Sequence, residues 1–159
     1  MHIALDGVQY FSSKKIRCQN CSHKTTSNGV TTYSHSAITP VVVAPGNERV
    51  IPLEPEFIVP QDGHEKQDCE QATAKRWINK HAAQYAPKKV TLSGDDLYCK
   101  QLFCELALEK GYDFLLVCKP ASHKMLYKEI ESLEADGLLS QMSVHCVTED
   151  KLEVYTYRY

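Results

Sequence analysis

The sequence predicts an α/β protein in which helices pack on a mixed β-sheet. Three segments rich in β-branched and aromatic residues come first and are joined by short or polar connections, as in an antiparallel meander. Shorter apolar segments then alternate with helical patterns, an order typical of parallel strands joined by crossover helices. The chain has 159 residues, which is enough for one domain with a sizeable core and too few for two ordinary ones.

The opening strands are predicted at residues 2–11, 30–44 and 50–59. Residues 12–28 are polar and contain a pair of cysteines, so we expect a loop inserted between the first two strands. Pro45-Gly46-Asn47 is a turn signal between the second and third strands. Pro52 and Pro55 favour an edge position for the third strand, because proline cannot donate a ladder hydrogen bond.

The second half of the chain predicts three helices, two strands between them and a closing hairpin. Gly111 and Gly137 stop the second and third helices. Residues 112–118 are apolar almost throughout, which favours a strand buried on both faces. The predicted elements are a helix at 68–85, a strand at 90–93, a helix that follows Asp96 and ends at Lys110, a strand at 112–118, a helix at 122–136 and a hairpin at 143–147 and 152–159.

Composition and charge favour a cytoplasmic protein without a membrane segment. Hydrophobic residues make up 43% of the chain and charged residues 24%, which is typical of globular domains. The longest apolar run, residues 114–118, is far too short to cross a bilayer. Seven cysteines with only one close pair fit a reducing compartment better than a disulfide framework. The net charge of −2 argues against strong DNA binding by this chain alone.

Two carboxylates stand where strands are predicted. Asp6 lies within the first strand, and Asp95 follows the fourth, with Asp96 next to it. Ligands of α/β sheets gather at the carboxyl ends of strands, so neighbouring first and fourth strands would bring the carboxylates to one site. Carboxylates are the ligands that Mg²⁺ prefers, and paired Mg²⁺ ions roughly 3.5–4 Å apart promote phosphodiester cleavage. The alternative is that Asp6 is a turn residue and that Asp95 or Asp96 caps the following helix.

Several short motifs in this order resemble a group of bacterial insertion-sequence transposases of the DDE type. The first-aspartate strand and the second-aspartate turn are each similar to that group, as are the stretch before the second aspartate and the strand after it. The similarity covers most of the chain. The motifs are residues 4–12 (ALDGVQYFS), 61–63 (QDG), 66–71 (KQDCEQ), 74–77 (AKRW), 92–98 (LSGDDLY), 116–120 (LVCKP) and 122–123 (SH).

The resemblance implies a ribonuclease H-like fold and DNA transposition by metal-dependent cleavage and strand transfer. Asp6 and Asp95 would be the first two catalytic carboxylates and would bind Mg²⁺ or Mn²⁺, with Asp96 as a further candidate ligand. DNA would be the substrate, and the complete protein would act as a homo-oligomer. A ribonuclease H-like nuclease or resolvase would use the same aspartates.

The family also needs a third acidic residue, a glutamate on a later helix. Glu149 and Glu153 lie in or beside the predicted closing hairpin, so neither is assigned that role. We therefore expect residues 1–159 to be a partial catalytic core, incomplete at its C-terminus and inactive by itself.

The cysteine pair offers a second type of metal site. Cys18 and Cys21 have the spacing of a zinc knuckle, with His23 and His35 nearby. A structural zinc site needs four ligands and a second matching pair is missing, so a metal-free loop remains the alternative. If zinc binds here, the chain could also be a non-catalytic binding fragment organised by this loop.

Overall fold

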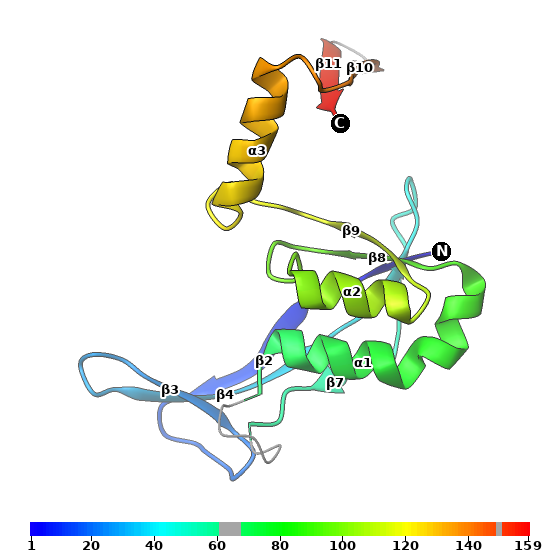
Figure 1. Cartoon of the computed structure of the whole chain (residues 1–159). Helices are drawn as coiled ribbons and strands as arrows, with labels where there is room; N and C mark the ends of the chain where they lie inside the picture. The colour runs from blue at the N-terminus through cyan, green and yellow to red at the C-terminus, as the bar shows by residue number, and fades with distance from the viewer. Residues whose placement is uncertain (61–67, 149–150) are drawn as a thin grey trace. The chain divides into compact units, whose positions relative to one another are not determined.

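The computed structural model describes residues 1–60, 68–148 and 151–159 and is mixed α/β, as predicted (Figure 1). The chain divides into two compact units, Met1–Cys118 and Lys119–Tyr159, which are described separately. Within the described ranges, no helix is both long and apolar enough to span a membrane.

The first unit contains a five-stranded mixed sheet, which confirms the predicted sheet type. Its order is β6 (Ile51–Pro52), β5 (Val41–Val43), β1 (His2–Ala4), β8 (Thr91–Gly94) and β9 (Asp113–Leu116). β1 pairs antiparallel with β5 and parallel with β8, and β8 is parallel to β9. β6 pairs only with β5 in this sheet, so Pro52 lies at an edge, as its missing N–H requires.

The three predicted opening strands are each divided between two sheets. The second sheet contains β2 (Gly7–Ser13), β4 (Thr31–Ile38), β3 (Ser22–Thr25) and β7 (Glu56–Phe57), with β2, β3 and β7 all antiparallel to β4. The predicted antiparallel arrangement is therefore confirmed, but the prediction that each of its three strands is continuous was wrong. The first strand breaks at Leu5-Asp6 and the second at Thr39-Pro40, where proline interrupts the ladder.

The predicted loop at residues 12–28 is only partly a loop. β2 continues to Ser13, and β3 forms a hairpin with β4. The turn between them is closed by hydrogen bonds from the Thr26 N–H to the Val30 carbonyl and from the Gly29 N–H to the Thr26 carbonyl. Gly29 has a φ of 74°, a left-handed conformation that glycine adopts without strain. Residues 14–21, which connect β2 to β3, contain the cysteine pair.

Two helices pack with the mixed sheet to form the main core. α1 (Glu70–Tyr85) is followed by a 3₁₀ turn (Ala86–Lys88), and α2 (Gln101–Glu109) lies beside α1 (Figure 1). Ile3 and Leu92 are paired neighbours on β1 and β8, and both are fully buried. The core consists of Ile3, Leu5, Ile38, Ala74, Trp77, Ile78, Tyr85, Val90, Leu92, Tyr98, Phe103, Ala107 and Tyr112.

The expectation that residues 112–118 are buried on both faces was wrong. β9 is an edge strand that pairs only with β8. Phe114 is 37% exposed and Leu115 is 68% exposed. The apolar run reflects a parallel strand, but among the described residues of this unit only β8 pairs with it.

The second unit contains α3 (Lys124–Ala135) and the predicted hairpin of β10 (Gln141–Thr148) and β11 (Lys151–Arg158). An ion pair of 2.7 Å joins Arg158 Nη1 to Glu134 Oε1 and so ties the hairpin to the helix. The helix begins after His123, two residues later than the predicted start at residue 122, and no side chain caps it.

Candidate carboxylate site and cysteine cluster

Asp6 and Asp95 follow neighbouring parallel strands in matched positions. Ala4 is the register partner of Ser93, and the Leu5 N–H donates a 2.8 Å hydrogen bond to the Ser93 carbonyl. Asp6 and Asp95 each lie two residues beyond that pair, and both are exposed. The sequence-based expectation that β1 and β8 are neighbours is therefore confirmed, and both carboxylates stand at the same edge of the sheet.

Each aspartate uses one oxygen for a local turn. Asp6 Oδ1 accepts a 2.9 Å hydrogen bond from the Gly7 N–H, and Asp95 Oδ1 accepts one of 2.9 Å from the Leu97 N–H. These bonds orient the carboxylates and still allow each to bind a cation, because the second oxygen of each carboxylate is not used in the turn bond. Asp96 is half-buried beside Asp95.

Helix capping does not account for these aspartates. α2 begins at Gln101, with Lys100 at its N-cap and no side-chain cap bond, so neither Asp95 nor Asp96 caps it. The predicted start of this helix after Asp96 was wrong, because residues 95–100 form successive turns. The Tyr98 N–H donates to the Asp95 carbonyl, and the Cys99 N–H donates to the Asp96 carbonyl.

A third carboxylate, Glu70, lies at the same edge and was not found from the sequence. It is in the first turn of α1, and its Oε1 accepts a 2.7 Å hydrogen bond from the Tyr98 hydroxyl. A Cβ added to Gly7 would overlap the Glu70 carboxylate, so this carboxylate lies directly against the backbone next to Asp6. A Cβ on Gly94 would come within 2.7 Å of the Tyr98 ring. Gly7 and Gly94, the glycines beside Asp6 and Asp95, thus make room for the Glu70–Tyr98 pair. These glycines were the one feature of the sequence that could have indicated a close neighbour at this edge.

The pKa of Tyr98 reflects these charges. Burial raises the pKa of its hydroxyl, and the hydrogen bond to Glu70 raises it further. The negative charges of Glu70, Asp6 and Asp95 raise the pKa in the same direction. Tyr98 therefore remains a neutral hydrogen-bond donor at any physiological pH.

The donor set at this edge consists of hard carboxylate oxygens, which fits Mg²⁺ or Mn²⁺ and fits zinc poorly. In the described part of the chain, Asp6, Glu70 and Asp95 do not bring an oxygen each to within 4.8 Å of one another. The site is therefore open, with carboxylates arranged around a sheet edge. Mutual repulsion between them makes this edge favourable for a cation.

Cys18 and Cys21 come together with His35, a residue that the sequence only suggested. The two Sγ atoms are 3.6 Å apart, and His35 Nε2 lies 3.3 Å from Cys18 Sγ and 3.4 Å from Cys21 Sγ. This cluster could hold a metal ion. His23, the other nearby histidine, is on β3 opposite Tyr33 and is not part of it.

Of the remaining acidic candidates and motifs, the structure describes only a part. Glu153 lies on β11, where it accepts a 2.5 Å hydrogen bond from the Tyr155 hydroxyl, so it is not on a helix, as expected. Glu149 and the motif residues 61–63 and 66–67 lie outside the described residues.

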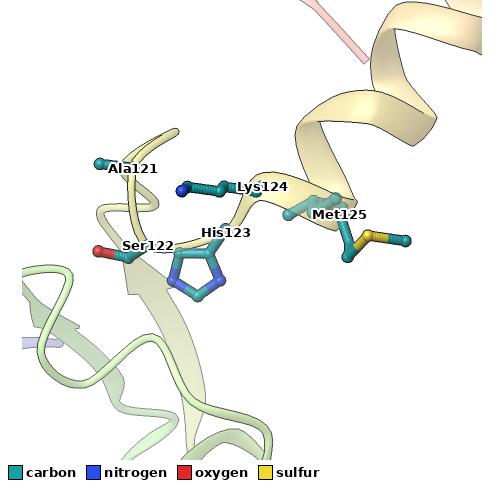
Figure 2. Close-up of a pocket in the computed structure, with 6 residues that line it drawn as sticks. Ala121, Ser122, His123, Lys124 and Met125 are labelled. Atoms are coloured by element: carbon teal, nitrogen blue, oxygen red, sulfur yellow. The ribbon is translucent and has the colours of Figure 1, made fainter.

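A pocket of about 400 Å³ lies at the start of α3 in the second unit (Figure 2). It is lined by six consecutive residues, 121–126, among them Ser122, His123 and Lys124. Figure 2 shows the His123 ring and the Ser122 side chain near the turn that precedes the helix. Because no distant segment of this unit contributes to the pocket, it has the features of a local surface hollow and not of a converging active site.

No model of a known protein family matches this sequence, and no curated protein matches it.

Proposed function

We propose that the chain is part of the catalytic core of a DDE-type transposase, which cleaves and joins DNA with Mg²⁺ or Mn²⁺. One observation carries this proposal: Asp6 and Asp95 occupy matched positions after adjacent parallel strands. The resemblance of the motifs around both aspartates supports the same assignment. The mixed sheet and its packed helices are compatible with a ribonuclease H-like core.

In this proposal Asp6 and Asp95 are the metal ligands, and Asp96 is a weaker candidate. A bound divalent ion would supply an activated nucleophile and would stabilise the leaving oxygen. The residues of this chain have simpler tasks. The turn bonds from Gly7 and Leu97 orient the two aspartates, and Tyr98 holds Glu70 beside them. DNA is the proposed substrate, and assembly with further copies is proposed for the complete protein.

Mn²⁺ binding tests the metal assignment. Titration followed by electron paramagnetic resonance should show binding to the parent chain that Asp6→Asn and Asp95→Asn each weaken by at least about tenfold. Asn keeps the acceptor oxygen that holds each turn, so the local fold is retained. The matched control is Asp113→Asn, an exposed aspartate that pairs with Thr91 at the opposite end of β8 and β9 from Asp95. Equal Mn²⁺ affinity in the parent and in both site variants would rule the assignment out.

Two other functions are compatible with some of the same structural features. A ribonuclease H-like nuclease or resolvase would use the same aspartates and would be distinguished by preferring an RNA–DNA hybrid or a DNA junction over transposon ends. A non-catalytic binding fragment organised by zinc is favoured by the Cys18, Cys21 and His35 cluster. That function requires zinc at the cysteines and predicts no effect of Asp6→Asn on any binding activity.

A further inference from the structure

We propose that Cys18, Cys21 and His35 are ligands of a structural Zn²⁺ ion that fastens the second sheet of the first unit. This proposal is independent of the function assigned to the carboxylate edge. The donors are two thiols and one imidazole, a set that favours zinc over Mg²⁺ or Ca²⁺.

The distances between the donor atoms are those that a tetrahedral zinc imposes. With Zn–S bonds of about 2.3 Å and Zn–N bonds of about 2.0–2.1 Å, two sulfurs should lie about 3.8 Å apart, and a sulfur and a nitrogen about 3.6 Å apart. The separations here are 3.6 Å for the two sulfurs and 3.3 and 3.4 Å for the two sulfur–nitrogen pairs. All three are within a few tenths of an ångström of the expected values. One ion can therefore contact all three donors after a small outward movement.

The backbone around the cysteines prepares them for this role. The Cys18 N–H donates a 3.2 Å hydrogen bond to Cys21 Sγ, and the Cys21 N–H donates to the Cys18 carbonyl at 3.3 Å. The tight turn thus holds both sulfurs on the same side.

His35 is positioned from the opposite direction by the β4 strand. Its ring stacks on Tyr10, with centroids 5.9 Å apart and planes 14° apart, and it also contacts Phe11 at 5.6 Å. These rings come from β2 and limit the rotation of the imidazole. The cluster therefore joins the loop at residues 18–21 to His35 on β4.

The second sheet needs such a link because it has little apolar core of its own. Most of β2 and β3 is exposed. Cys21 is 4% exposed, yet it is not a member of the main hydrophobic core. Its Sγ contacts Cys18 Sγ and His35 Nε2, which is the surrounding expected of a metal ligand and not of a small apolar core residue. Where apolar burial is small, zinc binding supplies folding free energy directly.

A disulfide between Cys18 and Cys21 is the competing chemistry. Their sulfurs are 3.6 Å apart, and His35 Nε2 is almost equidistant from both, a placement that a disulfide does not need. The tetrahedron has a fourth position, which the proposal assigns to water or to one further donor.

Metal analysis of the purified chain tests the proposal. We expect about one zinc per chain after growth in zinc-supplemented medium and purification with reductant. Replacement by Co²⁺ should give sulfur-to-cobalt charge-transfer absorption and the visible bands of tetrahedral Co²⁺. Cys18→Ser and His35→Gln should each weaken Co²⁺ binding by at least about tenfold. Cys18 is exposed, so its replacement by serine leaves the packing intact.

The controls are Cys69→Ser, an exposed thiol outside the cluster, and His2→Gln, an exposed histidine on β1; both should bind Co²⁺ like the parent. Removal of zinc from the parent by a chelator should speed hydrogen exchange at the β3 and β4 amides and leave β1 and β8 protected. Three results would overturn the proposal: a parent chain without metal, an isolated Cys18–Cys21 disulfide under reductant, or cobalt binding that Cys18→Ser does not weaken.

Discussion

Asp6 and Asp95 each stand two residues beyond the paired residues Ala4 and Ser93, on adjacent parallel strands of one sheet. The Leu5 N–H extends the ladder by one further hydrogen bond to Ser93 before the first strand ends. Two short strands thus deliver two carboxylates, distant in the sequence, to one sheet edge. Glu70 reaches the same edge from the start of α1.

The three carboxylates should destabilise the metal-free protein. Asp6→Asn removes one of three like charges and keeps the acceptor for the Gly7 N–H, so we expect the melting temperature without metal to rise by about 1–2 °C. Mg²⁺ at ten times its dissociation constant should stabilise the parent by about 1.4 kcal/mol and Asp6→Asn hardly at all. Thermal melts with and without Mg²⁺ measure both effects. A variant that gains as much from Mg²⁺ as the parent would contradict this prediction.

Asp68 should make stability depend on acid pH. Burial favours the neutral form of its carboxyl, but hydrogen bonds from Arg76, the Val59 N–H and Thr73, with the Arg76 charge, outweigh burial and lower the pKa. The Arg76 Nη2–Asp68 Oδ2 distance is 2.7 Å, and the Asp68 side chain is fully buried. Because the folded-state pKa is lowered, this contribution is complete above the unfolded pKa of about 3.9 and is lost as the pH falls through the folded value.

Asp68→Asn should therefore cost roughly 2–4 kcal/mol at neutral pH and flatten the loss of stability below about pH 4. Urea unfolding between pH 3 and pH 7 is the measurement. The control is Glu54→Gln, which removes an exposed ion pair with Lys80 and should change stability little. If Asp68→Asn and Glu54→Gln changed the free energy of unfolding by the same amount, the prediction that the buried Asp68 contacts stabilise the fold would be contradicted.

Two buried tyrosines should respond in opposite ways to loss of the hydroxyl. Tyr112 is 1% exposed, burial raises its pKa to about 12, and its hydroxyl has no hydrogen-bond partner among the described residues. Tyr112→Phe should therefore be neutral or stabilise the protein by up to about 1 kcal/mol. Tyr98→Phe removes the bond to Glu70 and should destabilise it by about 1 kcal/mol. Chemical unfolding of the two variants in parallel checks the sign of each change.

The chain of 159 residues alone should show no measurable DNA cleavage or strand transfer. The described carboxylates do not close around one point, so they would fix a pair of ions poorly. Each ~1.4 kcal/mol of lost transition-state stabilisation lowers the rate about tenfold. The net charge of −2 also gives little affinity for phosphates. The assay is nicking of supercoiled plasmid with Mg²⁺ or Mn²⁺.

Asp6→Asn and Asp95→Asn are the controls for any activity in that assay. Nicking by the parent but by neither variant would show that the prediction of an inert chain is wrong. Glu70→Gln would then test whether Glu70 completes the metal site, and Glu153→Gln would test the hairpin carboxylate in the same way.

The sequence predicted the position of Asp95 after the fourth strand, because the turn signal there is local, but it placed Asp6 inside a continuous first strand. The alternation of strands and helices predicts parallel neighbours. Glu70 was missed because it looks like an ordinary first-turn residue of a helix. Only the tertiary fold brings it to Gly7, where the absence of a side chain gives it room.

The strand breaks and the third metal-cluster residue were harder to predict. Nothing in the residues 2–11 pattern shows that the strand changes sheets at Leu5-Asp6, because both halves are rich in β-formers. His35 was one of two nearby histidines, and only the register of β4 with β2 selects it over His23. Burial of residues 112–118 was overestimated because an apolar run cannot show how many neighbours a strand has.

Paramagnetic broadening by Mn²⁺ tests the central claim most directly, because it locates the ion on the chain. In a ¹⁵N-labelled sample titrated with substoichiometric Mn²⁺, we predict that the amide signals of Asp6, Gly7 and Asp95 broaden first. Signals of the turn at residues 44–47, beyond the opposite end of the same sheet, should serve as the less affected reference in Asp6→Asn as well as in the parent. Broadening centred on other residues, or broadening of the Asp6 and Asp95 signals that persists in Asp6→Asn, would contradict the assignment of this sheet edge as a divalent-metal site.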